Sequence, residues 1–133
     1  MSRLLNHSEG SVIGGYWALK LDNKILSKIK LPKNIIGITG SSGKSSSAEL
    51  INNILKENNF KTVYNKEGSN TINAITSLIL NNTTLTGKFK SDVLIMELDE
   101  QYMKNVFKYF SPSILLITNI TRDQPPRNSH PEK

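Results

Sequence analysis

Four short apolar segments are separated along the chain by longer segments in which apolar residues recur at helical spacing. The short segments span residues 35–39, 62–64, 93–98 and 114–118. The first, third and fourth are almost continuous in Ile, Leu, Val and Met, which is typical of strands buried on both faces of a parallel sheet. We therefore expect four strands, of which three lie fully inside the protein.

The segments between these strands predict helices over residues 44–58, 71–80 and 101–110. Each places its apolar residues on one face. These faces consist of Ala48, Ile51, Ile54 and Leu55 in the first helix, Ile72, Ile75, Leu78 and Ile79 in the second, and Met103, Val106, Phe107 and Phe110 in the third. Strict alternation of strand and helix favours the α/β class, with a doubly wound parallel sheet.

The two ends of the chain depart from this alternation. Residues 1–33 form an N-terminal lead-in with a short helix that begins at Asp22, and we expect it to pack on the sheet through Tyr16 and Trp17 rather than to present those rings to a ligand. Residues 34–120 form the α/β domain. Residues 121–133 contain three prolines and no apolar periodicity, which indicates a loop or tail.

Composition narrows the class of protein. The chain has 133 residues, a formal net charge of +6 and no cysteine, so a disulfide framework is excluded. Its apolar runs are too short to span a membrane, and nothing resembles a signal peptide, so we expect a cytoplasmic protein. The lysines are scattered rather than clustered, which argues against a nucleic-acid partner.

The strongest candidate for chemistry is the turn between the first strand and the first helix, Gly37-Ile-Thr-Gly-Ser-Ser-Gly-Lys-Ser-Ser46. A glycine-rich turn that ends in Gly-Lys-Ser at a helix start is typical of a phosphate-binding loop (P-loop), in which successive backbone N–H groups converge on an anion. The lysine contributes a full charge and the serine hydroxyl can bind Mg²⁺. The residues predicted to bind the nucleotide are Gly40, Ser41, Ser42, Gly43, Lys44, Ser45 and Ser46.

Glu97 is the candidate carboxylate. It ends an apolar strand between Met96 and Leu98, where an unpaired charge is unfavourable. Ligands bind at the carboxyl ends of strands in open α/β sheets, so Glu97 and Ser45 are predicted to hold Mg²⁺ beside the phosphates of ATP.

These motifs resemble the ATP-binding middle domain of the Mur ligase family. The segment from Asn65 to Asn70 resembles that family's second phosphate-side loop, and 93–100 resembles the strand whose glutamate binds Mg²⁺. The segment from Asn119 to Gln124, with its Arg-Asp-Gln, is similar to the MurT-type subunits of lipid II isoglutaminyl synthases. The chain looks like the first part of such a domain, ending after about four strands.

The resemblance implies an ATP-dependent ligase of cell-wall peptidoglycan synthesis that activates a carboxylate as an acyl-phosphate and joins it to an amine. It implies nucleotide contacts at Asn70, catalytic roles for Lys44 and Asp123, a lipid II or muramyl-peptide substrate, and a glutamine amidotransferase partner of the GatD type. Three alternatives stay open. The chain could be a nucleotide-binding module or degenerate fragment without turnover, or it could come from another Mur-type or folylpolyglutamate-type ligase. The third, which the scattered lysines disfavour, is a basic nucleic-acid binder.

Overall fold

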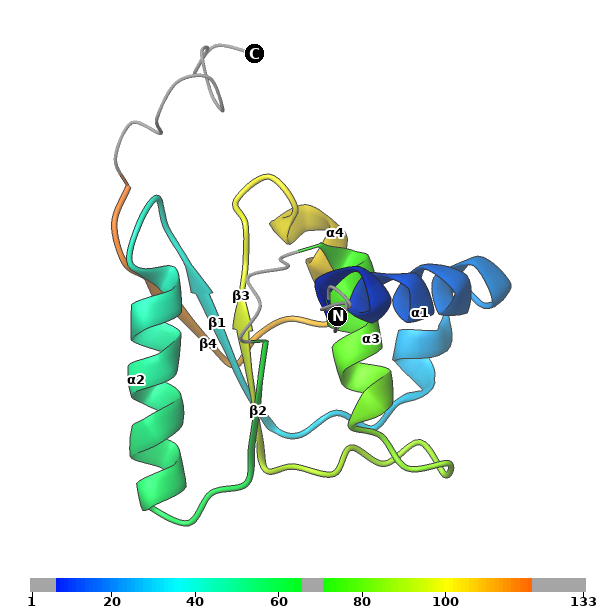
Figure 1. Cartoon of the computed structure of the whole chain (residues 1–133), viewed down its shortest axis with the longest axis horizontal. Coiled ribbons are helices and arrows are strands. Elements are labelled where there is room, and N and C mark those ends of the chain that lie inside the picture. Colours follow the sequence, from blue (N-terminus) through cyan, green and yellow to red (C-terminus); the bar gives the residue numbers. More distant parts are fainter. Residues whose placement is uncertain (1–6, 66–70, 121–133) are drawn as a thin grey trace, which may run out of the picture.

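The computed structural model describes residues 7–65 and 71–120 and contains a single parallel sheet. Its strands are β1 (Asn34–Thr39), β2 (Thr62–Tyr64), β3 (Val93–Glu97) and β4 (Ile114–Ile117), in the spatial order β2-β3-β1-β4 (Figure 1). All four predicted strands are observed, with ends that differ by at most one residue. Ile38 lies opposite both Glu97 and Leu116, so the carboxyl ends of β1, β3 and β4 reach the same edge of the sheet.

Helices cover the two faces of the sheet, as the doubly wound class requires. Helix α2 (Lys44–Glu57) packs on one face over Ile38, Val93 and Ile95. Helices α3 (Ile72–Asn81) and α4 (Met103–Phe107) cover the other face, where they enclose the larger apolar core (Figure 1). That core consists of Leu26, Ile35, Val63, Ile75, Ile79, Phe89, Leu94, Met96, Leu98 and Val106.

The predicted helix faces are largely confirmed. The apolar residues expected on the second and third helices all contribute to the larger core. Two details were wrong. Ile54 is half exposed, and the third helix is five residues long because 99–102 form a turn in which Tyr102 and Met103 donate backbone hydrogen bonds to the Asp99 carbonyl.

The N-terminal lead-in contains a long helix that the sequence did not predict. Helix α1 (His7–Leu21) is followed by a short 3-10 helix, η1 (Ile25–Lys28). Helix α1 packs along α3, with close approach at Gly15, where a Cβ atom would stand 1.8 Å from the Asn73 carbonyl oxygen. The Gly15 N–H also donates to Ser77 Oγ at 2.6 Å. A side chain at position 15 would force the two helices apart.

Two further expectations for the lead-in are corrected. Tyr16 and Trp17 do not pack it against the sheet, because α1 rests on α3 and both rings are about half exposed. Asp22 does not cap the short helix, which begins at Ile25. Instead the Asp22 carboxylate accepts the Lys24 N–H at 3.0 Å and pairs with the Lys28 ammonium.

Strand β4 is not buried as predicted. It is an edge strand beside β1, and its four side chains, Ile114, Leu115, Leu116 and Ile117, are all exposed. Within the described residues, α2 packs over β1, β2 and β3 but makes no comparable contact with β4.

Among the described residues, no helix is long and apolar enough to cross a bilayer.

Candidate functional site

The candidate site begins where β1 passes into α2. Gly40 and Gly43 have φ angles of 132° and 79°, which residues with side chains rarely adopt. At Gly40 a Cβ atom would also stand 2.2 Å from Thr118 Oγ1. Both φ angles favour glycine, and at Gly40 the Thr118 side chain also leaves no room for a Cβ atom.

The first turn of α2 presents backbone N–H groups to the outside. Gly43 is the N-cap residue and has no side chain with which to cap the helix. The first amide of the helix with a protein acceptor is that of Ser47, which donates to the Gly43 carbonyl at 3.0 Å. Among the described residues, the amides of Lys44, Ser45 and Ser46 have no acceptor. An uncapped helix start of this kind favours an anion, because the free N–H groups and the helix dipole act together.

The Lys44 ammonium is held above this turn, where it donates a hydrogen bond to the Gly40 carbonyl. This contact places a positive charge beside the free amides of α2. The predicted residues Gly40 to Ser46 are thus brought together at one edge of the sheet.

The sequence predicted that successive N–H groups of this turn converge on an anion. The structure differs in one respect, because two of these N–H groups donate to the protein itself. Ser41 N–H donates to the Asn119 carbonyl at 3.3 Å, and Ser42 N–H donates to Asn119 Oδ1 at 3.0 Å. Thr118 Oγ1 donates to the Ser42 carbonyl at 2.7 Å. Residues that follow β4 therefore fix the shape of the turn, and the groups free to bind an anion lie at 44–46.

Glu97 lies beside the start of α2. The side chain is only 2% exposed, and both carboxylate oxygens accept hydrogen bonds from neutral groups. Ser45 Oγ donates to Oε2 at 2.8 Å, and the Tyr64 hydroxyl donates to Oε1 at 2.8 Å. In the described part of the chain Glu97 has no cationic partner. A buried carboxylate in such a position is ready to accept a cation.

Tyr64 and Asn65, at the end of β2, complete this side of the site. Burial, and then the hydrogen bond to Glu97, raise the pKa of Tyr64 well above its usual value, so the phenol keeps its proton further into the alkaline range than an ordinary tyrosine does. Asn65 Oδ1 accepts the backbone N–H of Glu97 at 3.0 Å. The buried Asn65 Nδ2 and Thr39 Oγ1 have no partner within the described residues, and both lie at this edge of the sheet.

The order of the strands explains why these groups meet. Strands β1 and β3 are neighbours, but β1 leads into α2 on one face and β3 leads into α4 on the other. The connections diverge at this point, which is where ligands bind in open α/β sheets. Ser45 and Glu97 lie at this switch point.

The predicted site residues divide into three groups. Ser45 and Glu97, predicted as a pair, are in direct contact, and Lys44 lies on the same turn. Ser46 is exposed on the first turn of α2 and contributes a free amide. Asn70 and Asp123 lie outside the described residues.

Two residues of the site, Tyr64 and Asn119, were not predicted from the sequence to have a role in it. Both residues stand directly at the carboxyl end of a predicted parallel strand, and this position was the signal that could have identified them.

Fold and site together define an α/β protein with an uncapped helix start at the switch point of a parallel sheet. Residues 38–124 match the Mur ligase middle domain, and the chain therefore belongs to the Mur ligase family.

The chain is also similar in sequence to curated members of this family. The chain is 34% identical over 116 residues to the lipid II isoglutaminyl synthase (glutamine-hydrolyzing) subunit MurT of Staphylococcus aureus strain COL, which covers 86% of this chain and 26% of that protein. It is 34% identical over 124 residues to the subunit of the same name from Streptococcus pneumoniae strain R6, which covers 93% of this chain and 27% of that protein. The chain spans about a quarter of the length of these relatives.

Proposed function

We propose that this chain binds Mg²⁺-ATP at the start of α2 and supplies the nucleotide-binding part of an ATP-dependent amide ligase of peptidoglycan synthesis. One observation carries the proposal. The free amides of 44–46, the Lys44 ammonium and the Ser45–Glu97 pair lie together at the switch point of the sheet. Membership in the Mur ligase family supports the same function.

The donor set suits Mg²⁺. Hydroxyl and carboxylate oxygens are its preferred protein ligands, and Mg²⁺ usually takes only one or two of them together with phosphate oxygens and water. Ser45 Oγ and Glu97 Oε2 are 2.8 Å apart, and Glu97 is buried without a compensating charge in the described residues. No group of three or more acidic or histidine side chains that could hold a metal unaided occurs among those residues, which agrees with a metal shared with the nucleotide.

Each residue has a separate role in this proposal. The amides of α2 and Lys44 bind the β- and γ-phosphates and stabilise the charge that develops during phosphoryl transfer. Ser45 and Glu97 hold Mg²⁺, which neutralises phosphate charge when bound. Tyr64 keeps the Glu97 carboxylate turned toward Ser45. We extend the proposal to Asn70 as a nucleotide contact and to Asp123 as a catalytic residue, on the resemblance alone.

The reaction transfers the γ-phosphoryl group of ATP to a carboxylate of the substrate, and an amine then displaces phosphate to form the amide. The names of the relatives point to lipid II as the substrate and to glutamine as the nitrogen source. We therefore propose the D-glutamate α-carboxylate of lipid II as the acceptor, and ammonia from a glutaminase subunit of the GatD type as the amine.

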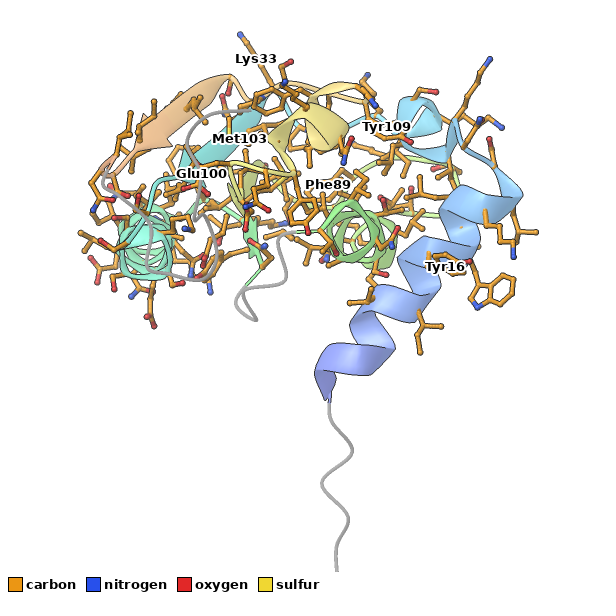
Figure 2. The ribbon with its side chains drawn as sticks, turned by 90° about the horizontal axis from the view of Figure 1, so that it is seen from above. Tyr16, Lys33, Phe89, Glu100, Met103 and Tyr109 are labelled. Carbon is orange, nitrogen blue, oxygen red and sulfur yellow. The ribbon has the colours of Figure 1, made fainter. Side chains whose placement is uncertain are left out.

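Calorimetric titration with Mg²⁺-ATP tests the nucleotide site. Lys44→Ala removes a charge-assisted contact and should weaken binding about 10- to 100-fold. The matched control is Lys33→Ala, because Lys33 is exposed before β1, at the opposite end of that strand (Figure 2). Equal affinities of Lys44→Ala and the unaltered chain would show that the phosphate site is misplaced.

An assay of catalytic turnover distinguishes the proposed ligase from a nucleotide-binding module without activity. Release of inorganic phosphate that requires both a muramyl-peptide substrate and ammonia supports the ligase. Tight Mg²⁺-ATP binding without such release supports the module, and acceptance of a folylpolyglutamate-type substrate instead would assign another ligase of the superfamily.

A further inference from the structure

Helix α1 has two different faces, and no other element of the described chain covers one of them. The Gly15 face is packed against α3. The opposite face carries a stripe of large apolar side chains, with exposed fractions of 57% for Ile13, 47% for Tyr16, 52% for Trp17 and 84% for Leu21. Figure 2 shows α1 on the outside of the molecule, with Tyr16 on the side away from α3. We refer to these four residues as the α1 stripe.

The aromatic part of the stripe is ordered around a lysine. The rings of Tyr16 and Trp17 meet edge to face with centroids 5.6 Å apart. The Lys20 ammonium lies 5.0 Å from the Trp17 ring and 5.8 Å from the Tyr16 ring. Aromatic rings with a polar edge beside a long cationic side chain are the residues that settle at the boundary between lipid tails and water.

Positive charge continues beyond the stripe. Residues 12–30 contain the lysines Lys20, Lys24, Lys28 and Lys30 and one acidic residue, Asp22. All four lysines are exposed, and within the part of the chain that the structure describes only Lys28 forms an ion pair, with Asp22. The stripe is thus flanked by uncompensated positive charge, which complements an anionic surface.

We propose that the α1 stripe and its lysines dock the protein on an anionic lipid surface, with α1 lying in the plane of the interface. Burial of the stripe in the headgroup region supplies the apolar contribution, and each nearby lysine adds attraction to anionic lipid. A protein partner would also accept the aromatic residues, but the excess of lysine around them favours lipid. The inference rests on α1 and not on the nucleotide site, so the two proposals fail independently. If the ligase proposed above acts on a lipid-linked substrate, this docking holds it at the surface where that substrate lies.

Trp17 is the only tryptophan of the chain, so its fluorescence reports on the stripe directly. We expect its emission to shift to the blue when vesicles containing phosphatidylglycerol are added, and to be quenched when the lipids carry bromine near the headgroups. Phosphatidylcholine vesicles should produce a much smaller change, and added salt should reverse part of the binding.

Two pairs of variants separate the apolar contribution to lipid binding from the electrostatic one. Leu21→Ser should weaken partitioning about tenfold, whereas Leu50→Ser, which alters an exposed leucine on α2, should leave it unchanged. Lys24→Gln should weaken it about fivefold, whereas Lys56→Gln on α2 should not. Circular dichroism confirms that each variant is folded.

Two results would overturn the proposal. One is unchanged Trp17 emission at saturating anionic lipid in a folded sample. The other is a blue shift that needs no lipid and grows with protein concentration, which would identify a second copy of this chain as the occupant of the stripe.

Discussion

At the scale of single residues, the site depends on a buried carboxylate that neutral groups hold in place. Tyr64 and Ser45 each donate a hydrogen bond to Glu97, one to each carboxylate oxygen. Such a group is costly to bury unless each oxygen has a partner or a cation arrives. In the described part of the chain no lysine pairs with Glu97, so the arrangement leaves the carboxylate free for the proposed Mg²⁺.

Tyr64 makes the stability of the protein depend on pH in the alkaline range. Its pKa is raised by burial and by Glu97, so the folded state keeps the phenol proton at pH values where the unfolded chain releases it. The resulting contribution to the free energy of unfolding is complete below about pH 10, the ordinary pKa of tyrosine, and is lost as the pH rises above it. We predict a shallower alkaline decline in the free energy of unfolding for Tyr64→Phe, measured by urea denaturation at pH 9 to 11. Parallel curves for the two proteins would contradict this account.

Asn119 holds the turn between β1 and α2, although it lies far from that turn in the sequence. Its backbone and side-chain oxygens hold the amides of Ser41 and Ser42, and its Nδ2 donates to Ser42 Oγ at 2.8 Å. We predict that Asn119→Ala loosens the turn, lowers the free energy of unfolding by about 1 kcal/mol and weakens Mg²⁺-ATP binding. Chemical denaturation and calorimetry measure the two effects. Asn53→Ala on the exposed side of α2 is the control, and an Asn119→Ala protein with unaltered affinity would show that the turn keeps its shape without this residue.

At the scale of elements, the packing of α1 on α3 depends on one glycine. A Cβ atom at Gly15 would lie 1.8 Å from backbone oxygen of Asn73, whereas one at Gly14 would lie 3.5 Å from Ser77 Oγ. We predict that Gly15→Ala destabilises the protein by about 1–3 kcal/mol, because the helices must separate. Gly14→Ala should be neutral or slightly stabilising, because alanine is the better helix former. Thermal unfolding compares the two, and equal effects would mean that α1 does not approach α3 closely.

The same helix shows where sequence patterns fall short. Gly10, Gly14 and Gly15 are ordinarily turn signals, and only the contact with α3 gives Gly15 a reason to lie within a helix. Strands β1 and β3, by contrast, could be predicted because their almost continuous apolar runs reflect burial on both faces.

The residues of the candidate site also fall into those that the local sequence predicts and those that it does not. Lys44 and Ser45 were predictable because a strand, a turn and a helix follow one another in sequence. Tyr64 and Asn119 reach the site only because β2 lies beside β3 and β4 lies beside β1. The order of strands in a sheet is a long-range property that local patterns do not contain.

At the scale of the whole molecule, β4 forms an apolar edge of the sheet. Its four side chains are exposed, and a strand edge without a neighbour among the described strands invites pairing with another chain. We predict that the 133-residue chain self-associates with increasing concentration and that the double substitution Ile114→Thr and Leu116→Thr shifts it toward the monomer. Sedimentation velocity measures the distribution, and an unchanged distribution would place the association elsewhere.

The proposed nucleotide site is tested most directly by following individual backbone amides during a titration with Mg²⁺-ATP. In ¹H–¹⁵N correlation spectra, we predict that the amide signals of Lys44, Ser45 and Ser46 move most, because they have no acceptor among the described residues. Those of Ser41 and Ser42 should move less, because Asn119 already occupies them. Saturable binding that leaves the signals of 44–46 in place would contradict the central claim that the start of α2 binds the phosphates.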